Sequence, residues 1–222
     1  DRVGAVASLT LLADEPNRVD TAGDVYSVAG GAVKRCHLQQ RESVEQLSAD
    51  AFSPSGVSAF YRTSVVMQAG GLDERFESYY EDVDLGFRIA AMDYRCAFAP
   101  QSICYHRLSA SYSPKSWRYH FNSARNAEIV WWANMPLALR WRYLPAHLAF
   151  LLMQGGHKLI QGAGLAWLAG KLSCLGHLSH IAGKRRRLAE LRCIDTAQLA
   201  DRLVRDWWSL HVASRTRSRR RA

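Results

Sequence analysis

Hydrophobic and polar positions divide this 222-residue chain into a first half of short strands and turns and a second half of longer amphipathic helices. The run VGAVASLTLL (3–12) alternates apolar and small residues, which is typical of a buried strand. Turn signals follow, and VYSVAGGAV (25–33) resumes an extended pattern. A polar helical stretch over 41–48 and a short strand over 57–61 complete this first segment.

Two helices and a further strand are predicted next. The first helix should end at Gly70 and Gly71, because glycine readily adopts the left-handed conformation that closes a helix. The second should begin near Asp82, where apolar residues recur at helical spacing while Asp84 and Arg88 lie four residues apart on another face. The letters YRCAFAP and SICYH then return to strand. The sequence therefore predicts a mixed α/β segment with carboxylates at the start of its second helix.

Six carboxylates lie within twelve positions of the stretch GGLDERFESYYEDVDLGFR, namely Asp73, Glu74, Glu77, Glu81, Asp82 and Asp84. A helix N-terminus favours acids, so Asp82 or Asp84 would simply cap the helix on one interpretation, and Asp84 would pair with Arg88. Six acids exceed what one cap needs, however, and clustered carboxylates beside a His-bearing strand suit general-base chemistry or a divalent cation. An EF-hand is not supported, because Gly86 stands where the third loop ligand should be.

Charge is distributed unevenly along the chain, whose formal net charge is +9. Residues 184–222 hold 12 Lys and Arg against 4 Asp and Glu, and no acidic residue lies between Glu128 and Glu190. All seven tryptophans lie at or after Trp117. A segment that is poor in acid, rich in Trp and Leu, and edged with Arg and Lys suits the surface of an anionic membrane.

The most apolar window, residues 143–170, is interrupted by His, Gln and Lys, whereas a spanning helix needs about 20 mostly apolar residues. We therefore expect these helices to lie at the membrane interface and not to span it. Ordinary core helices of a C-terminal subdomain are the alternative, because the periodic pattern fits both. The residues expected to make the membrane contact are Trp131, Trp132, Trp141 and the run Lys184 to Arg187.

The five cysteines are odd in number and form no C-x-x-C pair, so neither a disulfide framework nor a zinc site is predicted. A reducing, cytosolic setting fits this pattern best. The chain begins at Asp1 without an initiator Met or a signal sequence, and we expect it to be a fragment.

The segment SGVSAFYR, followed after eight residues by GGLDERFESYYEDVDLGFRIAAMDYRCAFAPQSICYH, resembles the second half of family 2 glycosyltransferases with the GT-A fold, particularly the bacterial rhamnosyltransferase-like branch. The resemblance covers about residues 1–135. It implies a partial GT-A α/β domain at 1–113, on the acceptor and catalytic-base side, and a helical, basic extension at 114–222. The family's metal-binding D-x-D motif has no counterpart upstream, so we expect a truncated chain that lacks the nucleotide-binding half and is inactive alone.

The resemblance also implies roles for individual residues. Asp82 would be the general base, because an attacking hydroxyl must lose its proton, and Glu81 would orient the acceptor, so that the acidic stretch lines an acceptor site. His106 would be a further ligand to Mg²⁺ or Mn²⁺ bridging the diphosphate, with a packed or solvent-facing side chain as the alternative. The substrate-binding positions would be Ser55, Gly56 and Arg62, although turn chemistry explains the first two equally well.

The implied function is that of an inverting, hexosyltransferase-type enzyme of cell-envelope polysaccharide synthesis. It would move a sugar, with rhamnose as one candidate, from a nucleotide-diphospho-sugar donor to a saccharide or lipid-linked acceptor, at the cytoplasmic face of the cell membrane. A non-catalytic membrane-associated interaction module is the first alternative. A nucleic-acid binder is the second, prompted by KRRR (184–187) and the C-terminal RTRSRRRA, but no base-reading motif accompanies these runs, so no specific nucleic acid is expected.

Overall fold

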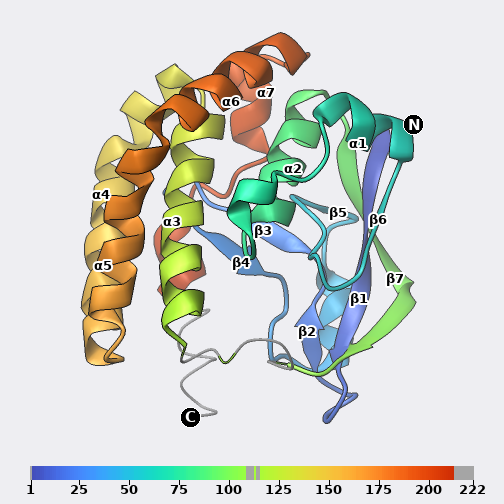
Figure 1. Cartoon of the computed structure of the whole chain (residues 1–222). Helices are drawn as coiled ribbons and strands as arrows, with labels where there is room; N and C mark the ends of the chain where they lie inside the picture. The colour runs from blue at the N-terminus through green and yellow to red at the C-terminus, as the bar shows by residue number, and fades with distance from the viewer. Residues whose placement is uncertain (1, 109–112, 114–115, 213–222) are drawn as a thin grey trace.

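The computed structural model describes residues 2–108, 113 and 116–212 of the chain. Its strands are β1 (Val3–Leu12), β2 (Val19–Thr21), β3 (Asp24–Tyr26), β4 (Ala32–Lys34), β5 (Asp50–Ala51), β6 (Ala59–Tyr61) and β7 (Arg95–His106). β1 is the central strand of a five-stranded sheet, with parallel β7 on one edge and antiparallel β6 and β2 on the other (Figure 1). β5 pairs with the outer edge of β7, while β3 and β4 form a separate hairpin.

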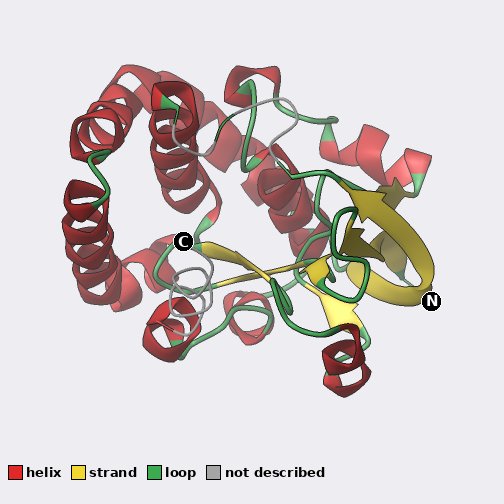
Figure 2. Cartoon of the chain, turned by 90° about the horizontal axis from the view of Figure 1, so that it is seen from below, coloured by secondary structure: helices red, strands yellow, loops and turns green. Residues whose placement is uncertain are grey.

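Most of the helices follow the sheet in the chain and stand beside it in space. They are η1 (Arg41–Gln46), α1 (Thr63–Ala69), η2 (Glu74–Phe76), α2 (Glu81–Ala91), α3 (Trp117–Asn134), α4 (Leu137–Ile160), α5 (Gly164–Ser173), η3 (Cys174–His177), α6 (Leu178–Leu191) and α7 (Thr196–Asp201). Seen from below, the long helices group on one side of the molecule and the strands on the other (Figure 2). In the described part of the chain, no helix is long and apolar enough to cross a membrane.

Several predicted elements are present with nearly their predicted bounds. The strand expected over 3–12 is β1, and the first helix, α1, ends at Gly70, whose φ of 91° is the left-handed conformation that glycine tolerates. The strand from YRCAFAP through SICYH is β7. Its pairing to β1 skips from Ala99 to Ile103, so that residues around Pro100, which has no N–H to donate, bulge outward. β7 then continues to His106, opposite Leu12 at the end of β1.

The extended conformation predicted over 25–33 is wrong in its middle. The backbone turns there: Ser27 N–H donates to the carbonyl of Gly31 over 2.9 Å, and Gly30 N–H donates to that of Ser27 over 3.0 Å. Val28 and Ala29 are buried beneath the helices and not within a strand, which is why their apolar run imitates a strand. The resulting hairpin places Asp24 directly opposite Lys34.

One hydrophobic core joins the sheet side to the helices. Tyr26 from β3 packs edge-on against Phe87 of α2 with ring centroids 5.1 Å apart, and both are fully buried with Trp131 of α3. The Trp131 indole N–H donates to the carbonyl of Val28 over 3.2 Å. The predicted boundary near residue 113 therefore marks a change from strands to helices, and both sides share this core.

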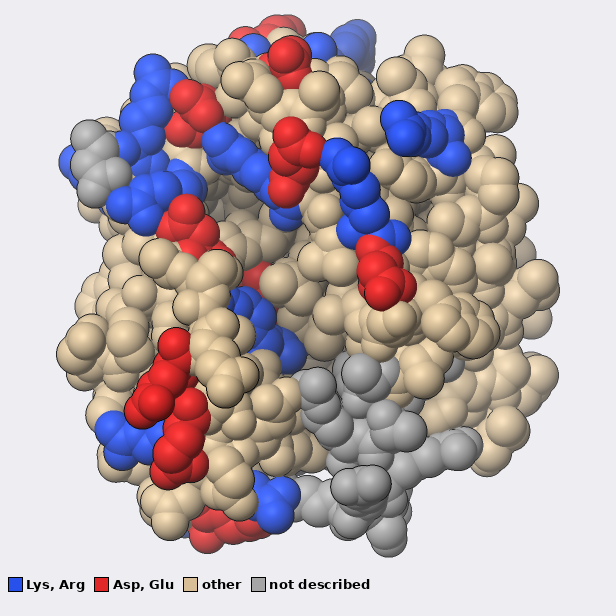
Figure 3. Space-filling model, turned by 180° about the vertical axis from the view of Figure 1, so that it is seen from behind, with Lys and Arg blue, Asp and Glu red and all other residues tan. Residues whose placement is uncertain are grey.

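Helices α4 and α5 are joined to this core by a buried series of hydrogen bonds between polar side chains. His147 stacks on the Trp131 ring with centroids 3.7 Å apart, and its Nδ1 lies 2.8 Å from the carbonyl oxygen of Ala29. Its Nε2 lies 3.2 Å from Glu128, which also receives a 2.7 Å bond from Lys171 of α5. Viewed from behind, Lys, Arg, Asp and Glu side chains gather along the top and at left, whereas the side formed by α4 and α5, at right, shows little charge (Figure 3).

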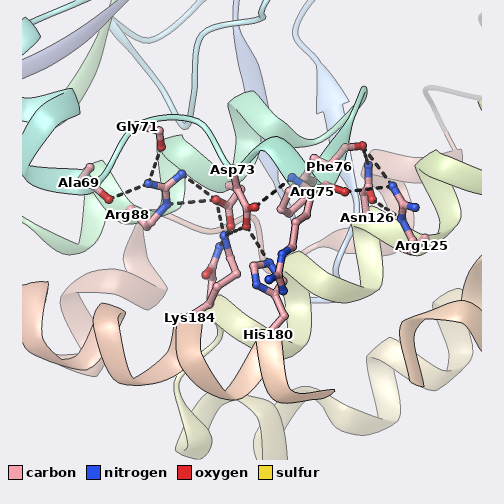
Figure 4. Close-up of polar contacts among 12 residues, drawn as sticks. Ala69, Gly71, Asp73, Arg75, Phe76, Arg88, Arg125, Asn126, His180 and Lys184 are labelled. Atoms are coloured by element: carbon pink, nitrogen blue, oxygen red, sulfur yellow. Dashed lines mark hydrogen bonds and ion pairs between the residues drawn. The ribbon is translucent and has the colours of Figure 1, made fainter. Parts of the chain in front are cut away.

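A buried carboxylate holds α2 to α3 and α6. Asp84 accepts from Arg88 at 2.8 and 3.0 Å, from Lys184 of α6 at 2.8 Å and from Asn134 of α3 at 2.9 Å. The expected pair of Asp84 with Arg88 is confirmed, within a larger cluster. Figure 4 shows Lys184 and His180 reaching from α6 to Asp73, each over 2.8 Å.

The middle of α2 touches the loop after β5 so closely that only glycine fits. A Cβ built on Gly86 would lie 2.4 Å from Cβ and 3.3 Å from Cα of Ser53. The loop has little room to withdraw, because the Ser53 carbonyl accepts from the backbone N–H of Asp24 and the Phe52 N–H donates to the Asp24 carbonyl, each over 2.8 Å. This contact sets the distance between α2 and the strands.

We predict that Gly86→Ala lowers the free energy of unfolding by about 1 to 3 kcal/mol, because overpacking outweighs the gain in helix propensity. Gly183→Ala is the matched control, since Gly183 also lies inside a helix but its added Cβ would meet nothing within 4 Å. That control should gain roughly 0.5 to 1 kcal/mol. Urea unfolding followed by circular dichroism measures both, and a stabilised Gly86→Ala protein would show that the contact is looser than described.

Candidate active site

The first turn of α2 presents the carboxylate of Asp82 to the loop before β6. Its Oδ2 accepts from the backbone N–H of Gly56 and its Oδ1 from that of Val83, each over 2.7 Å. Burial raises the pKa of Asp82, and these two N–H bonds act against that rise. A carboxylate fixed by two backbone donors, with a pKa moved toward neutrality, has the properties of a general base.

Glu81 stands beside Asp82 and completes a carboxyl pair. Burial, and then the negative charge of Asp82, raise the pKa of Glu81. Its Oε2 is buried and has no hydrogen-bond partner among the described residues. A Cβ built on Gly56 would lie 3.4 Å from Asp82 Oδ2 and 3.7 Å from Glu81 Oε1, so this glycine keeps the space between the two carboxylates open. Ser55, next to it, is buried. The structure thus brings four of the predicted site residues together.

His106, at the end of β7, belongs to a second cluster centred on Asp20. The fully buried Asp20 carboxylate lies 2.9 Å from His106 Nδ1 and 2.8 Å from Lys34 Nζ, while His37 Nδ1 lies 3.5 Å away. Burial alone would raise the pKa of Asp20, but hydrogen bonds from His37 and Lys34 and the charge of Lys34 hold it well below its ordinary value. Asp20 is therefore ionised, and it orients the His106 ring.

Asp24 lies between the two clusters. It is buried, and its Oδ1 has no hydrogen-bond partner in the described part of the chain. Burial, and then the charge of Asp82, raise the pKa of Asp24 to about 8, with Lys34 acting against them and Asp20 adding to them. A buried carboxyl oxygen without a hydrogen bond lowers stability unless a ligand or a proton satisfies it. Asp24 is therefore a further candidate residue of the site.

Sequence reasoning missed Asp20, Asp24 and Lys34. The letters TAGD (21–24) indicate only a turn, yet Asp24 ends this turn and Asp20 directly precedes it. Had the hairpin of β3 and β4 been recognised, its register would have placed Lys34 opposite Asp24. Nothing local in the sequence, however, indicates that Asp20 meets His106, 86 residues away.

Other predicted residues lie apart from these clusters. Arg62 precedes α1, and its Nε donates to the carbonyl of Val3 over 3.1 Å, near the opposite end of β1 from His106. Only Glu81 and Asp82 of the acidic stretch face the site, so the expectation that all six acids line it is wrong. Three of the other acids form ion pairs with basic side chains of the helices, namely Asp73, Glu77 and Asp84. Glu74 has no ion pair among the described residues.

The fit of a metal ion can be tested on these residues. Among the side chains that the structure describes, no group of three or more His, Cys, Asp and Glu is placed to hold one. His106 turns Nδ1 toward Asp20, which leaves Nε2 as its one free ligand atom. Asp20 is itself held by Lys34. The described residues therefore do not form a metal site by themselves.

We predict that Asp24→Asn stabilises the protein, and more so at high pH. The pKa of Asp24 is raised on folding. Below about pH 4 its carboxyl is neutral in both the folded and the unfolded state and does not reduce the free energy of unfolding. As the pH rises from about 4 to about 8, the unfolded state loses this proton first, and the free energy of unfolding falls. The amide removes this loss, so the gain should exceed about 1 kcal/mol near pH 8 and shrink near pH 5.

The control is Asp14→Asn, which changes an exposed acid and should show no such pH trend. Urea unfolding at both pH values measures the difference. An equal gain for Asp24→Asn at the two values would mean that Asp24 is already ionised in the folded protein.

The comparisons with known proteins agree with this geometry. The family model described as "Glycosyl transferase family group 2" matches residues 19–178, which is well over half of the chain and includes both carboxyl clusters. No curated protein matches the chain significantly. The mixed α/β architecture is consistent with the GT-A-like domain that the sequence predicts. The chain therefore belongs to glycosyl transferase family group 2.

Proposed function

We propose that this chain carries the acceptor side of an inverting glycosyltransferase, in which Asp82 takes the proton of the acceptor hydroxyl. The family supports glycosyl transfer in general, with a nucleotide-sugar donor and an acceptor. The observation that carries the assignment of the base is the Asp82 carboxylate, held by Gly56 and Val83 N–H groups at the start of α2 and without an ion pair among the described residues.

The chemistry follows from this placement. As the acceptor oxygen bonds to the anomeric carbon, its proton passes to a carboxylate oxygen of Asp82, and the bond to the diphosphate breaks with its electron pair leaving on the nucleotide. Attack from the face opposite the leaving group inverts the anomeric centre. Each Asp82 oxygen uses one lone pair for a backbone N–H and keeps another for the proton.

Glu81 and Gly56 shape the space for the acceptor. The unpartnered Oε2 of Glu81 can accept a hydrogen bond from a second hydroxyl of the same sugar, which would hold the reacting hydroxyl near Asp82. Gly56 has no side chain to fill the gap between the two carboxylates. A saccharide, whose hydroxyls donate hydrogen bonds, fits two adjacent carboxylates better than an acidic acceptor group does.

The finer parts of the proposal rest on the resemblance of the acidic stretch to the rhamnosyltransferase-like branch. We propose a rhamnosyl or related sugar, a lipid-linked or saccharide acceptor, and a role in cell-envelope polysaccharide synthesis at the cytoplasmic side of the membrane. The donor half with its D-x-D motif would lie upstream of this sequence. Mg²⁺ or Mn²⁺ is proposed as cofactor only together with ligands from outside the described residues, and the proton transfer does not depend on it.

We predict that Asp82→Asn lowers kcat by roughly 10²- to 10⁴-fold with little change in donor affinity, because the proton acceptor is removed while the size is kept. An amide can accept from only one of the two N–H groups, so Asp82→Ala is measured as well and should lose activity to a similar extent. The assay follows nucleoside diphosphate release from a panel of nucleotide-sugars, using this chain and the longest native chain that contains it.

Glu81→Gln tests which carboxylate is the base. It should raise the acceptor KM and lower kcat less than Asp82→Asn does, and a larger loss of kcat would assign the base to Glu81. If an active wild type keeps its turnover in both Asp82 variants, Asp82 is structural. A native chain without any transfer activity would instead favour the non-catalytic interaction module.

A further inference from the structure

Helices α4 and α5 expose leucine where a globular protein ordinarily exposes polar residues. On α4, the side chains of Trp141, Leu148, Leu152 and Leu159 are spaced by seven, four and seven residues, which places them on one stripe along the helix. Their exposed fractions run from 52% to 79%. The opposite side of α4 carries the buried His147, so the stripe faces outward.

The neighbouring helix continues this surface. α5 returns antiparallel to α4 after a short turn and packs on it through Trp167, whose ring would lie 3.2 Å from a Cβ on Gly155. Its own exposed side chains have exposed fractions of 47% to 76%. We call the whole surface the α4–α5 apolar face, and its residues are Trp141, Leu148, Leu152, Leu159, Ile160, Leu165, Leu168 and Leu172. A continuous apolar surface of this extent marks an interaction site.

The charge of the segment that carries this face selects its occupant. Residues 129–189 contain eight Lys and Arg and no Asp or Glu. Arg142, beside Trp141, and Arg186 of α6 are exposed. If a second copy covered the face in a two-fold dimer, Arg142 would be brought to an interface to which residues 129–189 contribute no carboxylate. Anionic lipid headgroups supply the missing negative charge, and the acyl region accepts the leucines.

We propose that the α4–α5 apolar face lies on an anionic lipid bilayer, with α4 and α5 parallel to the membrane plane and their leucines inserted below the headgroups. This lies beyond the proposed transfer reaction, because binding needs neither donor nor acceptor. It agrees with the finding that no described helix is long and apolar enough to span a membrane.

The structure assigns this contact to different residues from those expected from the sequence. Trp131 is fully buried, and Trp132 is partly buried in the core. In the basic run, Lys184 binds Asp73 and Asp84, and the Arg185 Nε donates to the Trp132 carbonyl over 2.7 Å. Of the residues expected from the sequence to contact the membrane, only Trp141, Arg186 and Arg187 are exposed.

The test is co-sedimentation of the chain with vesicles of phosphatidylcholine containing about one third phosphatidylglycerol, and with vesicles of phosphatidylcholine alone. The triple variant Leu152→Gln, Leu165→Gln, Leu172→Gln removes part of the apolar face and should weaken binding at least tenfold at low and at high salt. Arg142→Gln with Arg186→Gln should weaken it by about fivefold per charge at low salt only, because salt screens exposed charges.

The matched control is Met67→Gln with Phe60→Gln, which removes equally exposed apolar side chains of α1 and β6, away from the α4–α5 apolar face. It should bind vesicles like the wild type. Each variant is first checked for its helical circular dichroism, and Leu152→Gln alone is measured if the triple variant does not fold. Wild-type protein that stays in the supernatant with anionic vesicles at low salt would overturn the proposal. So would a leucine variant that binds normally, or a wild-type dimer in sedimentation velocity that the leucine substitutions dissociate.

Discussion

The buried carboxylate of Asp84 fixes the position of α2, and the candidate active site depends on that helix. Arg88, Lys184 and Asn134 donate to it, so α2, α3 and α6 meet at one point. Arg88 also donates to the carbonyls of Ala69 and Gly71, which ties in the end of α1. A buried charge costs several kcal/mol unless it is fully paired, so the loss of any donor would weaken all these junctions together.

Two carboxylates one helical half-turn apart therefore have opposite roles. Asp84 faces the helices and is neutralised by cations, whereas Asp82 faces the loop of Gly56 and receives only backbone N–H groups. Asp84 anchors the helix and Gly86 sets its distance from Ser53. Asp82 is therefore held in place without forming an ion pair of its own among the described residues. Holding a base in its working position before the substrate arrives is a large part of what an enzyme contributes to rate.

The sequence predicted what depends on local pattern and missed what depends on distant pairing. The bounds of β1, the end of α1 at Gly70 and the start of α2 beside Asp82 all follow from periodicity and capping within a few residues. The contact of His106 with Asp20 depends instead on which strands are neighbours, and periodicity does not encode that. The acidic stretch shows the same limit: Asp73, before η2, binds Lys184 of α6, whereas Asp82, nine residues later in α2, binds the backbone N–H of Gly56.

Helix α4 shows why its outer side could not be distinguished from its inner side by pattern alone. Its buried side includes His147, whose Nδ1 lies 2.8 Å from the carbonyl oxygen of Ala29 and whose Nε2 lies 3.2 Å from the Glu128 carboxylate. Burial would raise the pKa of Glu128, but Lys171 and His147 lower it to about 2, so the carboxylate stays charged. The helix is thus fastened to the core by polar contacts while Leu148 and Leu152 point outward. A helix whose polar groups face inward and whose leucines face outward offers an apolar surface to a partner, and the absence of Asp and Glu from residues 129–189 favours a lipid surface over a second copy of the chain.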